Sequence, residues 1–520
     1  MPELFNLSSW LLDRHIEAGR GGRVAVRAGE LSLTYTELLA EVSAAAAALR
    51  TLGVRPEERV VLVLRDTVAF AAAFLGAVRI GSIPVPANPL LPARDLAAIT
   101  RLARARILLT HDVEQGADIA AGAPEIGRVL CAPLDPQQVL SAGASSWEPL
   151  LHRGADTPAY PTWEDSPAFW LCTSGTTGEP KLVMHRHADA RVTAETYARH
   201  VLDLREDDRC YSAAPLFHAY GLGNALTFPL SVGASAIIDP ARPPRPQLVE
   251  QIVRRERPTL FFCIPTVYAA LLAADLPQET FQSVRLAVSA AEPLPAEVWR
   301  RFRERFGVEI LDGIGSTEAL HIFISNVPGA VRAGTSGLPV PAYEARLVDS
   351  AGCPVDCSVG EDCVGFLQVK GESLASGYWC ETQRSRMTFH GEWMSTGDLY
   401  SRSPDGYYTY LGRADDMLRV AGEWVSPAEV EGVLAEHPGV LEAAVVGERD
   451  AAGAQRPVAY VVLARGQEAA LAEVIEFCRP RLAGFKRPSR VILVDELPKT
   501  TTGKIQRFRL RAYSHEQTSG

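Results

Sequence analysis

Residues 168–181 read Ala168-Phe169-Trp170-Leu171-Cys172-Thr173-Ser174-Gly175-Thr176-Thr177-Gly178-Glu179-Pro180-Lys181. The apolar first part predicts a buried strand, which places the loop 173–181 at the carboxyl end of that strand. Glycines there let successive backbone N–H groups turn inward, and the hydroxyls and Lys181 complete an anion site suited to a polyphosphate. The common nucleotide loop is excluded, because Glu179 and Pro180 separate the second glycine from the lysine. A polar surface turn is the alternative for this loop taken alone.

Apolar runs and helical patterns alternate through the first three hundred residues. The runs 60–64, 260–264, 286–289 and 308–311 predict strands, and helices are expected over 68–79, from Pro265 onward and over 296–306. Unbroken apolar strands separated by helices are typical of a mostly parallel sheet covered on both faces. The fold class is therefore α/β and doubly wound, with ligands bound where loops such as 173–181 and 312–318 leave the strands' carboxyl ends.

The pattern changes after about residue 335. Short alternating runs at 345–349 and 364–369 predict antiparallel strands of a small barrel-like subdomain. Further on, Ser426-Pro427-Ala428-Glu429 is a capping box that opens a helix. Strands near 441–446, 457–464 and 490–494 and a helix near 468–481 complete a small α+β C-terminal domain.

Composition excludes several classes of protein. A chain of 520 residues with 47% hydrophobic and 22% charged residues is typical of a globular protein with at least two domains. A net charge of −10 argues against a nucleic-acid partner. The longest apolar run, 68–78, is too short to cross a bilayer, so no membrane insertion is expected, and residues 1–20 carry no secretory pattern. Nine scattered cysteines predict reduced thiols in a cytoplasm. Among them Cys353, Cys357 and Cys363 have the wrong spacing for a metal site.

Six segments in order carry a resemblance to a known family. They are the loop 173–181, 215–221 (PLFHAYG), 312–318 (DGIGSTE), 395–399 (STGDL), 412–415 (GRAD) and 498–504 (PKTTTGK). In this order they resemble the adenylate-forming superfamily of acyl- and aryl-CoA ligases, carrier-loading adenylation domains and luciferases. The resemblance covers essentially the whole chain. It implies a large N-terminal domain (1–412) that binds ATP and an acid, a hinge (413–416) and a mobile lid domain (417–520).

The resemblance also implies the roles of individual residues. The ATP phosphates would be held by Lys181 and the loop residues Thr173, Ser174, Gly175, Thr176, Thr177 and Gly178. Adenine, ribose and the activated phosphate would be bordered by Ala291, Asp312, Gly313, Ile314, Thr317, Asp398 and Arg413. Glu318 would hold Mg²⁺, Lys504 would stabilise the charge that develops at the α-phosphate, and Asp415 would be the hinge residue. Gly422 and Trp424 would line the CoA tunnel.

Segments 216–226 and 313–323 look most like those of benzoate-CoA ligases. The acid pocket implied is small and flat, with Ala219, Tyr220, Gly315 and His321 in its wall, and it suits benzoate or a substituted benzoate such as 2-aminobenzoate or a hydroxybenzoate. His218, Ala319 and Leu182 depart from the benzoate pattern. A histidine merely packed beside the site is the alternative for His321. CoA is the expected acceptor, and loading of a carrier protein in trans is the alternative. The residues give no indication of the oligomeric state.

Overall fold

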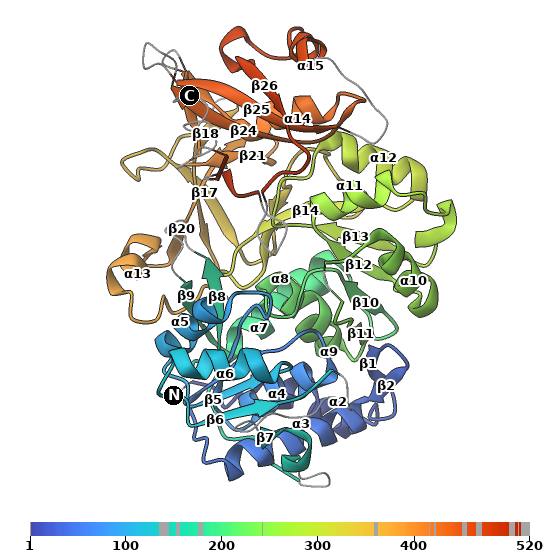
Figure 1. Cartoon of the computed structure of the whole chain (residues 1–520), viewed down its shortest axis with the longest axis vertical. Helices are drawn as coiled ribbons and strands as arrows, with labels where there is room; N and C mark the ends of the chain where they lie inside the picture. Colours follow the sequence, from blue (N-terminus) through green and yellow to red (C-terminus); the bar gives the residue numbers. More distant parts are fainter. Residues whose placement is uncertain are drawn as a thin grey trace.

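The computed structural model describes residues 2–134, 145–151, 156–174, 180–241, 243–357, 362–414, 416–420, 423–449, 455–463, 471–498, 505–507 and 509–510. Figure 1 shows the five-stranded parallel sheet at one end of the molecule and the C-terminal α+β unit at the other. A larger, mostly parallel sheet lies between them. This arrangement confirms the α/β, doubly wound class expected from the sequence.

The larger sheet has nine strands and six of them pair in parallel. Its order is β16 (Leu338–Pro339), β15 (Ile322–Ser325), β14 (Ile310–Gly315), β13 (Leu286–Ser289), β12 (Leu260–Cys263), β10 (Arg209–Ser212), β11 (Ser235–Ile237), β1 (Val24–Ala28) and β2 (Leu31–Thr34). The parallel part runs from β14 to β1, and β15, β16 and β2 are added antiparallel. A mixed edge of this kind is common on large α/β sheets.

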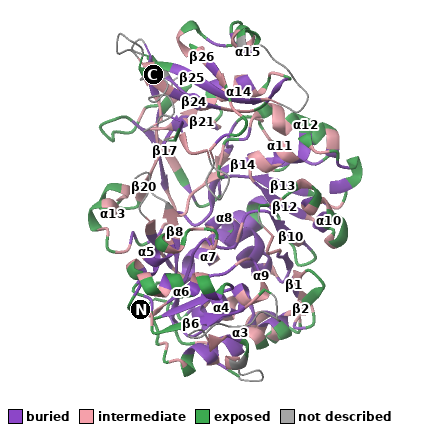
Figure 2. Cartoon of the chain, viewed as in Figure 1, coloured by how far each residue is buried: buried purple, intermediate pink, exposed green. Residues whose placement is uncertain are grey.

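Helices cover both faces of this sheet because its strands are apolar on both sides. Phe261 packs in the cluster formed with α10 (Pro246–Glu256), α11 (Pro265–Ala273) and α12 (Ala296–Phe306), whereas Leu260 and Phe262 pack in the cluster on the opposite face. Figure 2 shows buried residues concentrated in the strands and in central helices such as α4 and α8. Successive residues of one strand therefore supply two separate cores.

The second parallel sheet has the order β4 (Ile83–Pro86), β3 (Arg59–Val63), β5 (Ile107–Thr110), β6 (Arg128–Cys131) and β7 (Ser145–Ser146). It is flanked by α3 (Tyr35–Thr51), α4 (Val68–Arg79), α5 (Ala93–Ala103) and α6 (Val113–Gly122). Helices α3 and α4 approach closely, since a methyl group added at Gly76 would lie 2.9 Å from the Ala45 Cβ. Alanine-rich faces thus let this pair pack tightly between the two sheets. The remaining short helices of the N-terminal half are α1 (Leu7–Leu11) and α2 (Asp13–Glu17).

The strand predicted at 168–172 forms, and it lies outside the two parallel sheets. β8 (Pro167–Ser174) pairs antiparallel with β9 (Pro180–Arg186) as a separate two-stranded sheet, and α7 (His187–Thr193) follows. The loop between them is therefore a hairpin connection and does not lead from a parallel strand into a helix. Trp170 of β8 packs against Trp379, with ring centroids 4.7 Å apart and the ring planes tilted by 30°, and this contact holds the hairpin against the segment that carries Trp379.

The segment after residue 335 is antiparallel, as predicted. Its sheet contains β17 (Glu344–Val348), β18 (Cys363–Lys370), β20 (Trp393–Arg402), β19 (Phe389–His390) and β21 (Tyr408–Arg413), and α13 (Thr382–Thr388) lies beside it. One expectation is wrong here. Cys357 and Cys363 form a disulfide, whereas the other seven cysteines are unpaired. The Val355 N–H donates to the Leu347 carbonyl at 2.9 Å, so the described segment that ends at Cys357 folds back against β17, next to the strand that begins at Cys363.

The C-terminal unit contains α14 (Pro427–Ala435), α15 (Leu471–Cys478) and two small sheets. One sheet consists of β24 (Val440–Arg449), β25 (Gln455–Leu463) and β26 (Arg490–Leu493), and the other of β22 (Leu418–Val420) and β23 (Glu423–Val425). The capping box is confirmed in one half. The Ser426 hydroxyl accepts the Glu429 N–H, while the Glu429 carboxylate pairs with Lys486 at 2.7 Å. The same hydroxyl donates to the Leu411 carbonyl, which ties the unit to β21.

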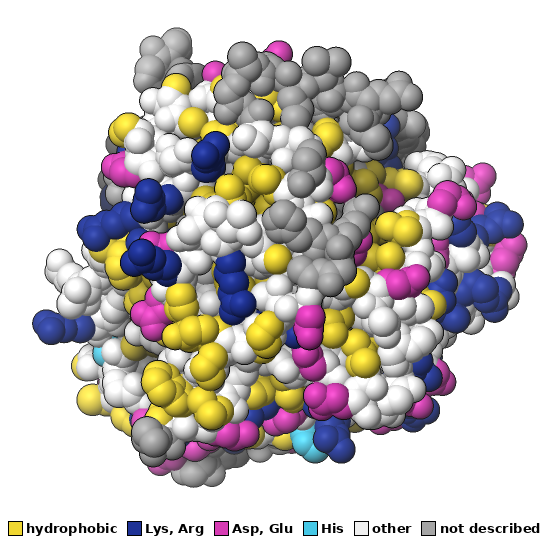
Figure 3. Space-filling model, turned by 90° about the horizontal axis from the view of Figure 1, so that it is seen from below, with side chains coloured by type: hydrophobic (Ala, Val, Ile, Leu, Met, Phe, Trp, Pro, Cys, Tyr) yellow, Lys and Arg dark blue, Asp and Glu magenta, His cyan; other side chains and the backbone are white. Residues whose placement is uncertain are grey.

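Two surface properties complete the description. Figure 3 shows Lys and Arg side chains interspersed with Asp and Glu on the face seen from below, around exposed hydrophobic side chains. Within the described ranges, no helix has both the length and the apolar character required to cross a bilayer.

Candidate active site

Glu318 lies in a cluster with Tyr378 and Lys181. The Tyr378 hydroxyl donates to Glu318 Oε1 at 2.7 Å, and the Lys181 Nζ lies 5.7 Å from the centroid of the Tyr378 ring. Burial raises the pKa of Tyr378, and the Glu318 carboxylate raises it further, so the phenol stays protonated and donates. Tyr378 escaped the sequence analysis, because 60 residues separate it from Glu318. The predicted phosphate lysine and the predicted metal carboxylate thus share Tyr378 as a neighbour.

β9 reaches this cluster with one of its two faces. Val183 packs with Tyr378 and Ala375, while Leu182 and Met184 pack on the opposite face against the core of the five-stranded sheet. Lys181 shares the Val183 face because side chains alternate along a strand. Lys181 is also the register partner of Thr173. The hairpin therefore delivers the first and last residues of the predicted phosphate segment to one place.

A buried histidine on β9 contacts the segment that carries Glu318. The His185 Nε2 donates to the carbonyl oxygen of Thr317 at 2.8 Å, and its Nδ1 lies 2.9 Å from Asp189 Oδ2. Both His185 and Asp189 are fully shielded from solvent. Neither was a candidate in the sequence analysis, since the contact joins a strand to a segment 132 residues away.

Asp398 and Arg413 meet as cross-strand partners of β20 and β21. The Arg413 Nη1 donates to Asp398 Oδ1 at 3.1 Å and to the Thr396 carbonyl at 2.8 Å. Gly397 between them has φ +76°, and a methyl group there would lie 2.9 Å from the guanidinium, so glycine is required. Two residues chosen from separate motifs, Asp398 and Arg413, thus form one ion pair.

The predicted adenine segment belongs to a strand where the sequence suggested a loop. Asp312, Gly313, Ile314 and Gly315 lie in β14, because β15 returns antiparallel and pairs with its last residues. Burial raises the pKa of Asp312 to about 8, so its carboxyl is mostly protonated at neutral pH. Ala291, beyond the end of β13, has φ +77°, an unusual conformation for a residue with a side chain. Such outliers often occur at ligand sites.

Asp312 and Asp398 belong to one region. Burial raises the pKa of the Tyr400 phenol, and the carboxyl groups of Asp398 and Asp312 both raise it further. Tyr400 therefore lies within electrostatic range of both. Hydrogen bonds connect the two segments, since the Tyr400 hydroxyl lies 3.1 Å from the Ser336 Oγ and the Asn326 side-chain amide donates to the carbonyls of Thr335 and Asp312.

The predicted acid-pocket residues surround His321. A chain of helical turns, α8 (Ala219–Leu222), the π-helical turn η3 (Gly223–Thr227) and α9 (Phe228–Val232), brings Asn224 Oδ1 to 3.1 Å from His321 Nε2. The Tyr220 ring centroid lies 5.6 Å from that of His321, and the Tyr220 hydroxyl donates to the Val288 carbonyl at 3.0 Å. Burial lowers the pKa of His321 to about 3, so the imidazole is neutral. The wall is therefore aromatic and uncharged.

Close backbone approaches shape this wall. A methyl group at Gly315 would lie 2.5 Å from the His321 carbonyl oxygen, and one at Gly223 would lie 2.5 Å from the His321 Cδ2. Ala219 is buried at the start of α8. His321 is itself packed and hydrogen-bonded, as in the alternative stated from the sequence, and Asn224 is the partner which that analysis missed.

Several predicted residues cannot be placed. Gly175, Thr176, Thr177, Gly178, Asp415, Gly422 and Lys504 lie outside the described residues. Of Ser174 and Trp424 the backbone alone is described, in β8 and β23 respectively. Their roles stay predictions.

The residues present fit a magnesium ion held mainly by its substrate. Among the described residues, no group of three or more His, Cys, Asp or Glu side chains converges as a metal cage. Glu318 offers a carboxylate beside Lys181 and Tyr378. A single carboxylate, completed by phosphate oxygens and water, is a usual way for proteins to hold Mg²⁺.

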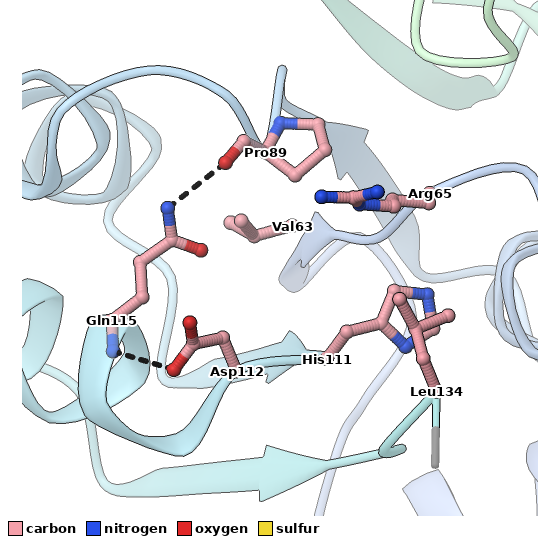
Figure 4. A pocket seen from close by; sticks show the side chains of 7 residues that line it. All are labelled: Val63, Arg65, Pro89, His111, Asp112, Gln115 and Leu134. Atoms are coloured by element: carbon pink, nitrogen blue, oxygen red, sulfur yellow. Dashed lines mark hydrogen bonds between the residues drawn. The ribbon is translucent and has the colours of Figure 1, made fainter. Parts of the chain in front are cut away.

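A cavity of about 230 Å³ lies at the carboxyl end of the five-stranded sheet (Figure 4). Its polar groups are largely engaged with one another, since Gln115 Nε2 donates to the Pro89 carbonyl and the Gln115 N–H to Asp112 Oδ1. None of the residues predicted for the adenylate site lines it. We place the candidate site at the larger sheet, where the predicted residues meet.

Known proteins resemble the chain over nearly its whole length. The family model described as AMP-binding enzyme matches residues 12–379, and the model of its C-terminal domain matches residues 429–504. A benzoate–CoA ligase of Thauera aromatica is 44% identical over 98% of this chain and 97% of its own. The crystal structure of the anthranilate CoA ligase AuaEII with anthranoyl-AMP matches with a TM-score of 0.95 at 37% identity, covering 100% of this chain and 99% of that one. A benzoate CoA ligase from Burkholderia xenovorans LB400 matches with a TM-score of 0.89 at 44% identity, covering 98% and 100%.

Proposed function

The chain belongs to the AMP-binding enzyme family, and on this premise we propose that it is an ATP-dependent aryl-CoA ligase. It activates benzoate or a substituted benzoate as an aryl-adenylate and transfers the aryl group to CoA, with release of pyrophosphate and then AMP. The observation that carries the proposal is the 44% identity to a benzoate–CoA ligase across almost the full length of both chains. The neutral aromatic wall around His321 supports an aryl acid.

The chemistry requires positioned charges more than acid–base groups. A carboxylate is a poor electrophile, so it first attacks the α-phosphate of ATP and forms a mixed anhydride with AMP as the later leaving group. Catalysis of such a phosphoryl-type transfer rests mainly on alignment and on stabilisation of developing charge. Lys181 supplies a cation for the phosphates. Magnesium, held by Glu318, neutralises phosphate charge when bound. The residues 173–178 and Lys504 are proposed partners on the strength of the family motifs.

Asp398 and Arg413 suit the ribose. Their mutual ion pair fixes both side chains, and a carboxylate is the type of acceptor that two adjacent hydroxyls of a ribose require. The neighbouring Ala291, Asp312, Gly313, Ile314 and Thr317 then border the adenine and the α-phosphate.

The acid pocket favours a flat, neutral ring. The neutral state of His321 supplies no cation for a second carboxylate on the substrate. Gly315 lets the His321 backbone approach closely, because a methyl group there would lie 2.5 Å from the His321 carbonyl oxygen, and this contact fixes the position of the pocket wall. The high structural similarity to an anthranilate CoA ligase supports 2-aminobenzoate as a substrate to compare with benzoate.

The second half-reaction is proposed to use a different orientation of the C-terminal domain. Residues 413–416 act as the hinge, with Asp415 at its centre, and residues 417–520 as the lid. Gly422 and Trp424 then border the path of the CoA thiol. We propose a cytoplasmic enzyme in which the seven unpaired cysteines stay reduced and the Cys357–Cys363 disulfide is the exception.

The test is an AMP-release assay with ATP, Mg²⁺ and CoA across benzoate, 2-aminobenzoate, the hydroxybenzoates, cinnamates and medium-chain fatty acids. Mass spectrometry identifies the products. A CoA thioester formed with the highest kcat/KM from a small benzoate is expected. A higher kcat/KM for a fatty acid would overturn the assignment of an aryl acid as substrate. Accumulation of aryl-AMP without thioester would indicate that the acceptor is a carrier protein and not CoA.

A further inference from the structure

The pair His185–Asp189 occupies a position that no part of the proposed chemistry uses. Asp189 lies in the first turn of α7, directly after the strand that ends at Arg186, so strand and helix meet at this pair. The exposed side-chain fraction is 0% for both residues. A buried carboxylate beside a buried imidazole is costly to desolvate unless every polar atom is satisfied. Here both ring nitrogens of His185 and both carboxyl oxygens of Asp189 have a hydrogen-bond partner.

The partners of the pair fix its orientation. Asp189 accepts the Arg186 N–H on Oδ2 at 3.0 Å and the Arg186 Nε–H on Oδ1 at 3.0 Å. Both nitrogens of His185 lie within hydrogen-bonding distance of an oxygen atom, one of the Asp189 carboxyl group and the other of the Thr317 carbonyl, so the ring is held at both edges. Phe169, the cross-strand partner of His185, stacks on the imidazole with ring centroids 5.4 Å apart. The ring can therefore neither tilt nor flip without losing contacts.

The Thr317 carbonyl that receives this hydrogen bond closes the turn which contains Glu318. The Leu320 N–H donates to the same oxygen at 3.1 Å, and Leu320 adopts φ +66°, a strained conformation for leucine. The Glu318 carbonyl accepts the Ala375 N–H at 2.8 Å, and its carboxylate accepts the Tyr378 hydroxyl. The backbone of the turn is thus held from one side by His185 and from the other by the segment around Tyr378.

We propose that His185, oriented by Asp189, is a positioning residue that sets the place of the Glu318 carboxylate relative to Lys181. The inference rests on the proposed function, because it assigns Glu318 to Mg²⁺-ATP. Lys181 and His185 lie on one face of β9, four residues apart, and so a rigid strand links the phosphate lysine to the metal carboxylate. Outer hydrogen-bond partners of metal-binding groups act in this way by orienting the ligand.

The chain supplies a matched control in His187. His187 is also fully buried and lies two residues further along the chain. Its Nδ1 accepts the Leu7 N–H at 3.1 Å, so its hydrogen bond joins a different segment from the one that carries Glu318. Replacing either histidine by alanine removes a buried ring of equal size. Loss of packing is therefore common to both variants, whereas loss of the Thr317 contact belongs to His185→Ala alone.

The experiment measures binding of Mg²⁺ with α,β-methylene-ATP by calorimetry, together with the KM values for ATP and for benzoate. We expect His185→Ala to weaken Mg²⁺-nucleotide binding by about 10-fold to 100-fold, the range typical for lost outer-shell partners of a metal site. His187→Ala leaves this binding unchanged, and the KM for benzoate changes little in both variants. His185→Gln, which restores one donor toward Thr317, recovers part of the loss. Asp189→Asn serves as a second probe of the same pair and weakens binding as well.

A double-mutant cycle with Glu318→Ala decides whether His185 acts through Glu318. In the Glu318→Ala background, His185→Ala is expected to cause no further loss of nucleotide binding. Additive losses, or equal binding by His185→Ala and His187→Ala, would overturn the inference. Absence of turnover by the wild-type chain with every acid would instead refute the proposed function. The comparison of nucleotide binding by His185→Ala and His187→Ala would still test the role of His185.

Discussion

Asp312→Asn should stabilise the protein, and the gain should grow with pH. Asp312 is 7% exposed, and burial raises its pKa from an ordinary 3.8 to about 8. The folded chain must therefore keep this carboxyl protonated at a pH where the unfolded chain would ionise it. At about 1.4 kcal/mol per pH unit, this costs about 2 kcal/mol at pH 5 and about 4 kcal/mol at pH 7.

The sign follows from the direction of the pKa shift. An acid whose folded pKa is raised destabilises the fold progressively as pH rises from its unfolded pKa to its folded pKa. Asparagine has nearly the same shape and needs no proton, so the variant avoids that cost. The difference in unfolding free energy between Asp312→Asn and wild type should rise from pH 4 to pH 8 and stay level above it.

The assay is differential scanning calorimetry of both proteins at several pH values between 5 and 8.5. Asp208→Asn is the control with the opposite sign. Burial opposes ionisation of Asp208, but hydrogen bonds from Arg285 and Thr259 outweigh it and lower the pKa, so this variant should be destabilised once pH exceeds the ordinary carboxyl pKa. An equal shift of the melting temperature at pH 5 and pH 8 for Asp312→Asn, or a loss at pH 8, would show that Asp312 is ionised in the folded protein and refute the reasoning.

Three further predictions concern single groups of the site. Tyr378→Phe removes the 2.7 Å hydrogen bond to Glu318, and since hydrogen bonds to charged groups contribute about 1.5–3 kcal/mol, the KM for ATP should rise about 10-fold or more; an unchanged KM would contradict this. Gly315→Ala places a methyl group 2.5 Å from the His321 carbonyl oxygen and should cost about 1–3 kcal/mol in unfolding free energy while raising the KM for benzoate. Its control, Gly432→Ala in α14, meets no atom within 4 Å and should be neutral or stabilising. Lys504→Ala should abolish adenylate formation but spare thioester formation from supplied aryl-adenylate, and equal loss of both steps would remove Lys504 from its catalytic role.

Much of the parallel architecture was predictable because local signals coincide with it. The strand 286–289 and the helix 296–306 occur with the predicted bounds, since an apolar run flanked by turns and a periodic helix with a proline before it leave little ambiguity. The pairing of 168–172 was not predictable. The sequence of an apolar strand does not show whether its neighbour in the sheet is parallel or antiparallel. The strand that pairs with 168–172 also begins only after a glycine-rich loop.

Individual residues of the candidate site were predictable from the sequence, but the contacts between them were not. Asp398 and Arg413 were both chosen from motifs, yet their ion pair depends on the register between β20 and β21. Tyr378 and His185 carry no local signal, because their importance comes from contacts with Glu318 and Thr317 far along the chain. The disulfide Cys357–Cys363 was missed for a similar reason. The number and scatter of cysteines indicate a cellular compartment, but they do not show which two cysteines lie close together in the fold.

The alternation of β9 has a consequence for insertions and deletions. Lys181, Val183 and the imidazole on the same face are separated by even numbers of residues, and Leu182 and Met184 fill a different core. Losing or gaining one residue between Lys181 and His185 would turn one of them toward the wrong side of the hairpin, where no compensating rotation is available. In homologous or engineered chains the number of residues between Lys181 and His185 should therefore stay constant.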